Sequence, residues 1–272
     1  MQHQEFESPD ELQHLIKCFW YTRMDFAEEE SSFEVIPDGY AEITFHFGSS
    51  CSIFYNGILQ PLPSPFLVGL LNQPVLFYTK RHLTVIGIRC FPWTVFDLLG
   101  LPAGKEGIRT FEHPVACLQD TLAQYVHKNQ LSEAITLVKQ YFLDIWLRTE
   151  TDKMLLRAGG AMRNTNGTMP VSQIAEAAHT TIRTLERRFK HSSGHTIKDV
   201  AGLMRFEQVR NHLWQYPEAS LAGLAYDFGY TDQAHLSREF KRYSGTTPAA
   251  FARKTKQRKK IINNDFVAFI QA

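Results

Sequence analysis

The first half of the chain shows hydrophobic residues that alternate with polar ones, which is typical of half-buried β-strands. The alternation is clearest in 34–47, where Val35 is followed by Ile43, Phe45 and Phe47 on one face. A Pro-Asp-Gly turn at 37–39 lies inside this stretch. Further β-rich runs, separated by Gly or Pro, are found at 66–71, 75–78 and 83–90. This half is therefore predicted to form a small β-barrel or sandwich.

After Pro92 the hydrophobic positions recur with the period of a helix. Helices are predicted at 94–99, 116–126, 131–146, 171–178, 197–214 and 221–228. The segment 197–214 has an apolar stripe and polar positions that include Lys198, Arg205 and Arg210. At ~1.5 Å per residue it spans about 27 Å.

The formal charge of +1 is distributed unevenly along the chain. Residues 1–153 carry 11 Lys+Arg and 19 Asp+Glu, a balance of −8. Residues 154–260 carry 18 Lys+Arg and 8 Asp+Glu, a balance of +10. Such an asymmetry indicates that the second part meets a polyanion and the first does not.

The basic part contains an internal repeat. The sequence 185–190, followed by Gly194, returns as 236–241, followed by Gly245, a displacement of 51 residues. Each copy is predicted to form a helix, a tight turn and a second helix. Ser172 and Ser220 are the expected N-caps of the first helices. In the second copy the turn is expected at Gly229 and the next N-cap at Asp232. The segment 197–214 would hold the two copies about one groove repeat of DNA apart.

The region 154–251 resembles the DNA-binding domain of AraC-type regulators. The resemblance is carried by Ala225, Gly229, Tyr230, Asp232, Gln233, the run His235-Leu236-Ser237-Arg238-Glu239-Phe240-Lys241, Gly245, Pro248 and Phe251. It implies two helix-turn-helix units that bind double-stranded DNA. One departure is His179, which stands where the family usually has the turn glycine; Thr180 follows it in place of an apolar residue.

The resemblance also assigns DNA contacts by position. Base edges are expected to meet Arg183, Glu186, Arg187, Gln233, Ala234, His235 and Arg238. Arg, Gln and Glu are the side chains that pair with guanine, adenine and cytosine respectively. Phosphate contacts are expected from Thr181, Lys190 and Lys241.

The N-terminal region 9–100 resembles the cupin-like sensor domain found in some AraC-type proteins. The segments that show this resemblance are Ile36-Pro37-Asp38-Gly39 with Glu42-Ile43-Thr44-Phe45, and Val85-Ile86-Gly87-Ile88-Arg89 before Phe91-Pro92. Metal-binding cupins use two histidines on one strand, whereas His46 stands alone, so we expect no metal and no cofactor. Phe45, Phe47, Phe54 and Tyr55 either line a ligand cavity or pack in the core, and the ligand-binding residues stay unassigned.

The predicted fold is α+β: a small cupin-like β-barrel with flanking helices, then an all-α domain of two helix-turn-helix units joined by a long helix. The expected domains are 1–149, a sensor with a helical tail, and 150–255, the DNA-binding domain. A C-terminal tail, 256–272, contains part of the basic run 253–260 and the apolar segment 261–272. No apolar run reaches the length of a membrane span, and the N-terminus lacks a secretion signal, so a cytoplasmic protein is expected.

The sequence is compatible with three different functions. In the first, a small molecule or partner bound by the N-terminal half changes how a transcription regulator engages DNA. In the second, that half serves only to form a homodimer. The third is a DNA alkyl-transfer repair protein, which needs an activated thiolate. Cys18, Cys51, Cys90 and Cys117 are far apart and expected to be buried, so the chain is predicted not to be an enzyme. RNA polymerase is a further candidate partner.

Overall fold

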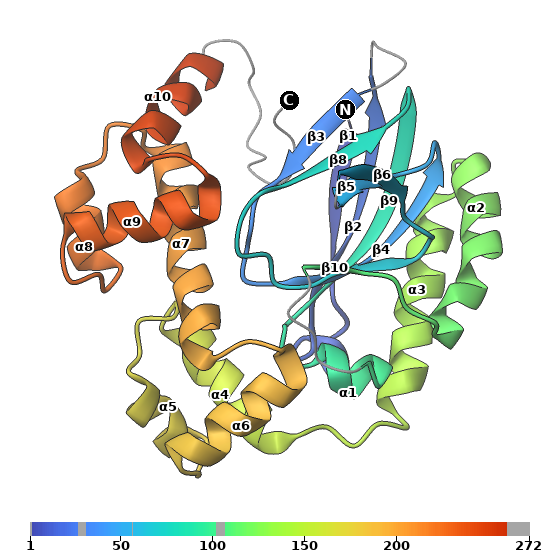
Figure 1. Ribbon diagram of the computed structural model, residues 1–272. Coiled ribbons are helices and arrows are strands. Elements are labelled where there is room, and N and C mark those ends of the chain that lie inside the picture. The colour runs from blue at the N-terminus through green and yellow to red at the C-terminus, as the bar shows by residue number, and fades with distance from the viewer. Residues whose placement is uncertain (1, 27–30, 56, 102–106, 260–272) are drawn as a thin grey trace.

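The computed structural model describes residues 2–26, 31–55, 57–101 and 107–259. A β-rich N-terminal domain is followed by an all-helical C-terminal domain, and the two pack side by side (Figure 1). This arrangement confirms the α+β fold class. The strands form two sheets that face each other, however, and not a closed barrel.

The larger sheet is antiparallel. In spatial order it consists of β1 (Gln2–Glu7), β2 (Ile16–Asp25), β9 (His82–Cys90), β4 (Ala41–Gly48), β7 (Phe66–Val68) and β10 (Ile108–Arg109). The smaller sheet, also antiparallel, consists of β3 (Ser31–Val35), β8 (Val75–Thr79), β5 (Ser52–Tyr55) and β6 (Ile58–Pro61). The strand predictions at 34–47, 66–71, 75–78 and 83–90 are confirmed, with 66–71 shortened to β7. The strands β1, β2, β5, β6 and β10 were not predicted.

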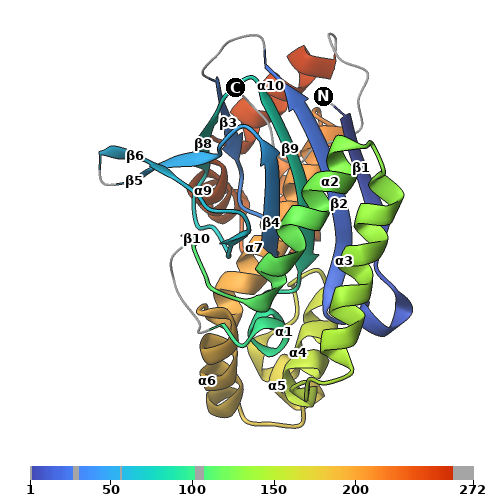
Figure 2. The same cartoon turned by 90° about the vertical axis from the view of Figure 1, so that its right-hand side faces the viewer.

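The two faces of β4 have different roles. Ile43, Phe45 and Phe47 belong to a buried cluster that includes residues of α2 (Gln119–His127) and α3 (Leu131–Trp146). Figure 2 shows these two helices covering the outer face of the larger sheet. The alternate residues of β4, Glu42, Thr44 and His46, line the space between the two sheets. The alternation seen in the sequence therefore separates a helix-covered face from an interior face.

Short helices also lie within the N-terminal domain. Helix η1 (Asp10–Leu12) links β1 to β2, α1 (Val95–Leu99) follows β9, and η2 (Pro114–Leu118) leads into α2 and α3. Helix α4 (Lys153–Asn164) then begins the helical domain. The helical predictions at 94–99, 116–126 and 131–146 are confirmed to within a few residues. Asp152 caps α4, because its side chain accepts hydrogen bonds from the amides of Met154 and Leu155.

The C-terminal domain consists of two helix pairs joined by one long helix. Its remaining helices are α5 (Val171–Ala177), α6 (Ile182–Ser193), α7 (Ile197–Gln215), α8 (Leu221–Asp227), α9 (Gln233–Ser244) and α10 (Pro248–Lys259). The predictions at 171–178, 197–214 and 221–228 are confirmed as α5, α7 and α8. Helix α10 was not predicted and carries the basic run as far as Lys259. The apolar segment 261–272 lies outside the described residues.

A buried cluster crosses the boundary between the domains, joining Leu70, Phe91 and Trp93 to the core of the helical domain. The ring of Trp93 lies against Gly159 of α4. The backbone carbonyl of Trp93 accepts a 2.6 Å hydrogen bond from the hydroxyl of Ser192. The guanidinium of Arg163 stacks 4.3 Å from the centroid of the Phe91 ring. The domains therefore share one hydrophobic core at this junction.

Candidate nucleic-acid interface

The second helix pair, α8 and α9, has the geometry that its sequence predicted. The hydroxyl of Ser220 accepts from the amide of Gly223 and so caps α8. Gly229 makes the turn with a φ of 70°. Asp232 caps α9 by accepting a 2.6 Å hydrogen bond from the amide of His235. These expectations for the second copy are confirmed, and together they fix where α9 begins.

Helix α9 separates its buried residues from its exposed ones. Leu236 and Phe240 are fully buried, as expected for positions four residues apart that pack inward. The exposed positions include Gln233, Ala234 and Arg238. The N-terminal part of α9 therefore presents three of the predicted base-reading side chains to solvent.

His235 is more engaged than the sequence indicated. Its Nδ1 accepts a 3.3 Å hydrogen bond from the amide of Thr231, and its Nε2 lies 3.8 Å from the carboxylate of Glu239. Its ring also packs edge-to-face on Tyr230, with centroids 5.3 Å apart. These contacts hold the half-buried imidazole of His235 against the turn, and the rest of the ring is exposed to solvent.

The first helix pair, α5 and α6, repeats the pattern with a non-glycine turn. His179 has a φ of 52°, the left-handed conformation that the missing glycine requires. Ser172 was expected to cap α5, but that prediction is wrong: α5 starts at Val171 and Pro170 occupies the N-cap. Proline fixes the φ that this position needs, and the helix begins two residues earlier than a Ser172 cap would allow. Thr181 caps α6 through a hydrogen bond from the amide of Thr184.

The exposed side of α6 carries the other predicted base-reading residues. Leu185 and Phe189 are fully buried, whereas Arg183 and Arg187 are exposed and Glu186 is half-buried. Two basic residues expected to contact phosphate, Lys190 on α6 and Lys241 on α9, are also exposed. Lys190 lies towards the other domain and lines a crevice of about 220 Å³ there, together with Asn72 and Arg242 among others.

Helix α7 holds the two pairs apart. It begins with a capping box in which Thr196 and Asp199 satisfy each other's backbone amides. Its 19 residues span about 28 Å at ~1.5 Å per residue, close to the ~34 Å between successive major-groove faces on one side of DNA. The guanidinium of Arg205 on α7 donates to both carboxylate oxygens of Glu239 on α9, at 3.3 and 3.4 Å. The sequence did not single out this pair, which orients α9 relative to α7.

The second helix of each pair, α6 or α9, carries the predicted base-reading residues and is termed a recognition helix. Both recognition helices have the same orientation relative to the N-terminal domain. Their C-terminal ends face it: Ser192 bonds to Trp93, and Gly245 lies next to Pro74. Figure 1 shows their N-terminal ends, where the helices follow α5 and α8, on the side away from the sheets. The predicted base-reading residues therefore lie on a face that the N-terminal domain leaves open.

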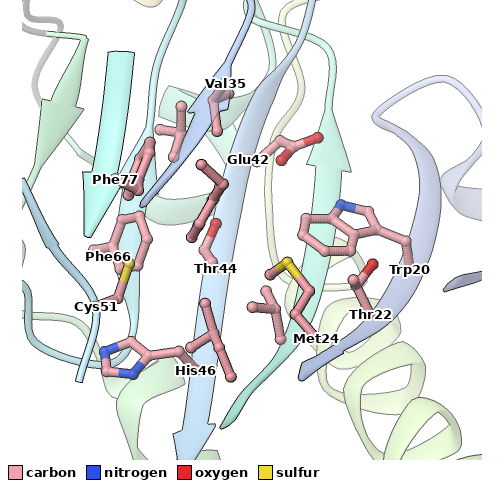
Figure 3. Close-up of a pocket in the computed structure, with 14 residues that line it drawn as sticks. Trp20, Thr22, Met24, Val35, Glu42, Thr44, His46, Cys51, Phe66 and Phe77 are labelled. Carbon is pink, nitrogen blue, oxygen red and sulfur yellow. The ribbon is translucent and has the colours of Figure 1, made fainter. Parts of the chain in front are cut away.

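A narrow cavity lies between the two sheets (Figure 3). Its volume is about 50 Å³, room for roughly four water-sized groups. The lining is mostly apolar and includes Trp20, Met24, Phe33, Phe66 and Phe77, with the polar residues Thr22, Glu42, Thr44 and His46. The hydroxyl of Thr44 is buried and has no hydrogen-bond partner within the part of the chain that the structure describes.

The aromatic residues that the sequence offered as cavity lining lie elsewhere. Phe45 and Phe47 are buried under the helices, which matches the core alternative. Phe54 and Tyr55 are exposed on the smaller sheet, where they line an open groove of about 530 Å³. Trp20 and Met24 were missed because β2 is buried on both faces and so does not alternate. Its continuous apolar and aromatic run at 18–21 was the available signal.

One end of the cavity meets a buried ion pair. Arg89 Nε donates a 2.7 Å hydrogen bond to Glu42, and its other nitrogens approach Glu5 at 3.4 Å and Asp38 at 3.9 Å. Burial raises the pKa of Glu42 to about 7, against the opposing pull of Arg89. The ring Nε2 of His46 lies 3.2 Å from the carbonyl of Leu62, as expected for a structural histidine, and burial lowers its pKa.

Three of the four cysteines have thiols that are not activated for ionisation. Burial raises the pKa of Cys18 and Cys51 to about 12 and raises that of Cys90 as well. Cys117 is exposed, so the prediction that all four are buried is wrong for this residue. Among the residues that the structure describes, no cluster of histidines, cysteines and carboxylates could hold a metal ion, and no helix could span a membrane.

Comparison with family models gives two matches that follow each other along the chain. Residues 174–254 match a helix-turn-helix domain, and residues 4–106 match a domain of unknown function (DUF6597). The first match begins within α5 and runs through α6, α7, α8 and α9 into α10. Residues 174–254 form a helix-turn-helix domain of the AraC type.

The chain is also similar to a curated protein. Over 75 residues it is 33% identical to the HTH-type transcriptional activator RhaS of Escherichia coli (strain SE11). That stretch covers 28% of this chain and 27% of RhaS, so the match spans about a quarter of the length of the relative.

Two solved structures show a more distant likeness. ToxT from Vibrio cholerae strain SCE256, solved with a bound unsaturated fatty acid, is 12% identical with a TM-score of 0.47. The match covers 86% of this chain and 94% of ToxT. The DNA-binding domain of AdpA in complex with a target DNA is 22% identical with a TM-score of 0.37. That match covers 41% of this chain and all of AdpA's domain.

Proposed function

We propose that this chain is a sequence-specific DNA-binding regulator of transcription. The observation that carries the proposal is the pair of capped recognition helices, α6 and α9, whose exposed N-terminal parts share the face opposite the sheets. Helix α7 separates them by a length that suits two adjacent major-groove segments. A single copy of the AraC-type domain would thus contact DNA twice.

The charge distribution supports the same function. The balance of +10 in residues 154–260 lies in the domain that would meet phosphates, and the balance of −8 lies in the other domain. On this proposal Arg183, Glu186 and Arg187 read one groove segment, and Gln233, Ala234, His235 and Arg238 read the next. Thr181 and Lys241 contact the DNA backbone, whereas Lys190, which lines the crevice towards the N-terminal domain, is less well placed for such a contact.

The N-terminal domain is the proposed sensor. Its cavity takes a small, mostly apolar molecule with one hydrogen-bonding group, because the lining is apolar and the buried hydroxyl of Thr44 needs a partner. A bound molecule changes activity only by favouring one arrangement of the two domains over another.

On this proposal the regulator acts in the compartment that holds the DNA, and its further partners are RNA polymerase and a second copy of the chain. Regulation of transcription requires that the protein either contacts or obstructs RNA polymerase, and a homodimer would present two DNA-binding domains to one promoter. The chain itself performs no chemistry on this proposal. The alkyl-transfer alternative would rest on Cys117, since burial suppresses ionisation of the other three thiols.

Selection from a pool of random duplexes followed by fluorescence anisotropy tests the DNA binding. We expect a selected sequence to bind with an affinity of roughly 10⁻⁸ M or tighter, and the affinity to fall steeply with salt. Arg148→Ala, a loss of one exposed positive charge just after α3, serves as the control and should bind normally. Folded protein that enriches no sequence would overturn the proposal.

A thermal-shift screen with small metabolites tests the sensor role. A ligand that binds the folded protein in the cavity raises the unfolding temperature, and above its dissociation constant the rise grows with the logarithm of the ligand concentration. Thr44→Val keeps the shape of the side chain and removes the hydroxyl, so it should weaken the shift given by any active compound. An equal shift in both proteins would place the compound elsewhere.

A further inference from the structure

The smaller sheet exposes an unusual amount of apolar surface. Nine large hydrophobic residues are exposed in the described part of the chain, and five of them lie on this sheet. They are Phe54, Tyr55, Ile58, Leu59 and Leu76, and Ile58 is 71% exposed. Apolar side chains gathered in this way on one element mark an interaction site more often than chance exposure does.

The hairpin of β5 and β6 is apolar on both of its faces. Phe54 pairs with Leu59 across the hairpin, and Tyr55 pairs with Ile58 on the opposite face. Figure 2 shows the hairpin projecting from the body of the sheets. A solvated hairpin normally has at least one polar face, so both faces here are suited to contact with protein.

The hairpin also ends in an edge that carries no charge, and only Pro61, at the end of the short strand β6, lacks an amide for pairing. Strand β6 is the last strand of its sheet, and all four of its residues are exposed. Proteins usually protect such edges with charged residues, yet positions 47–79, which include the whole hairpin, contain no Asp, Glu, Lys, Arg or His. This edge can therefore pair with another strand without opposition from charge.

We propose that the β5–β6 hairpin is the interface between two copies of this chain, with β6 of one copy pairing antiparallel to β6 of the other. Each four-stranded sheet would then continue into its partner across a two-fold axis. The benefit of such a dimer for reading a promoter rests on the proposed function, but the interface itself does not depend on DNA binding.

Three features favour a second copy as the occupant. A surface without charge is compatible with itself, whereas a charged surface would repel its own copy in a two-fold arrangement. The four exposed side chains of the hairpin, Phe54, Tyr55, Ile58 and Leu59, offer on the order of 500 Å² per copy, which gives about 1,000 Å² in total, the size of a weak and reversible interface. A groove of about 530 Å³ beside the hairpin, lined by Ile53, Leu62 and Val75 among others, can accept apolar side chains of the partner.

The arrangement also leaves the DNA face free. The N-terminal ends of α6 and α9 lie on the side of the helical domain away from the sheets, whereas the hairpin extends from the sheets themselves (Figures 1 and 2). Two copies joined through β6 would therefore keep both of their AraC-type domains available.

Sedimentation equilibrium of the full chain, without DNA, tests the interface. We expect a reversible dimer of the wild type with micromolar dissociation, and at least a tenfold weaker one for both Ile58→Glu and Ile58→Lys, because each places like charges across the two-fold axis. An equimolar mixture of these two variants should restore the dimer. Leu147→Glu, at a 74% exposed position after α3, is the matched control and should dimerise like the wild type.

The variants alter exposed positions, and their thermal unfolding should match that of the wild type, which separates loss of pairing from loss of folding. A wild type that stays monomeric at about 100 µM overturns the proposal. So does an Ile58→Glu variant that dimerises normally, or a mixture of the two charged variants that remains monomeric. Failure of DNA binding, by contrast, would leave this result unchanged.

Discussion

The guanidinium of Arg210, on α7, donates a 3.2 Å hydrogen bond to the backbone carbonyl of Pro37, in the turn that precedes β4. The same side chain is only 6% exposed and lies 3.8 Å from the carboxylate of Glu207. Next to Pro37, Gly39 packs against Met204 of α7. The helix that spaces the two DNA-binding units is therefore held by a turn of the sensor domain. That turn also contains Asp38, which approaches Arg89.

Replacing Arg210 with alanine should destabilise the protein by about 2–4 kcal/mol. The change leaves the Pro37 carbonyl without this donor and the partly buried Glu207 without its cation, and removal of one partner from a largely buried pair is costly. Burial already raises the pKa of Glu207. Urea unfolding followed by tryptophan fluorescence measures the effect. Arg23→Ala, which breaks a half-exposed contact with Asp25, should change stability by less than ~1 kcal/mol. Equal losses in the two variants would contradict the role given to Arg210.

Two adjacent glycines of α4 give a matched test of the domain junction. A Cβ on Gly159 would lie 2.1 Å from the Trp93 ring, whereas one on Gly160 would meet nothing within 4 Å. Gly159→Ala should therefore push the domains apart at Trp93 and lower the unfolding temperature by several degrees. Gly160→Ala should stabilise α4 by about 0.5–1 kcal/mol, because alanine favours helix more than glycine. Calorimetry on both variants measures these opposite shifts, and a loss of stability in both would contradict this account.

The sequence predicted the helical domain well because its information is local. The caps at Ser220 and Asp232, the turn at Gly229 and the inward pair Leu236 and Phe240 all depend on residues within one or two turns of each other. The exposed side of each recognition helix follows from the same periodicity.

The sensor domain and the contacts between domains could not be predicted in this way. The bonds from Arg210 to Pro37 and from Ser192 to Trp93 join residues 173 and 99 positions apart in the sequence, and no short pattern reports them. The alternation in β4 was visible, but nothing local indicated that its less hydrophobic face, and not Phe45 and Phe47, lines the cavity.

The two turns of the AraC-type domain should respond in opposite ways to substitution. His179→Gly should stabilise the protein by up to about 1 kcal/mol, because glycine adopts a φ of 52° without the steric cost of a side chain. Gly229→Ala should destabilise it by about 1 kcal/mol or more, since its φ is 70° and the added Cβ would lie 3.2 Å from Thr168. Thermal unfolding of each variant measures both effects. A stability loss for His179→Gly would mean that the imidazole makes a contact worth more than the strain it carries.

The buried carboxyl of Glu42 should give the protein a defined pH dependence. Its pKa in the folded protein is raised from 4.5 to about 7, so the folded state binds the proton more tightly than the unfolded chain does. Stability from this group is present below pH 4.5 and is lost as the pH rises towards 7. Glu42→Gln should therefore flatten the fall in unfolding free energy between pH 5 and pH 7. Parallel urea titrations of both proteins at these pH values measure the difference, and identical slopes would show that Arg89 keeps Glu42 ionised throughout.

Alanine substitutions on the two recognition helices test how DNA is read. If Arg187 and Gln233 contact base edges, each alanine variant should lose about 1–3 kcal/mol on the selected sequence and tolerate other bases at one position. Lys241→Ala provides the contrast, because loss of a phosphate contact weakens binding to all sequences alike and lowers the salt slope by about one. Anisotropy with the selected duplex and its single-base variants distinguishes the two patterns. Uniform weakening by Arg187→Ala would place its guanidinium on the phosphate backbone, and an unchanged affinity for Gln233→Ala would remove α9's first residue from the contact with DNA.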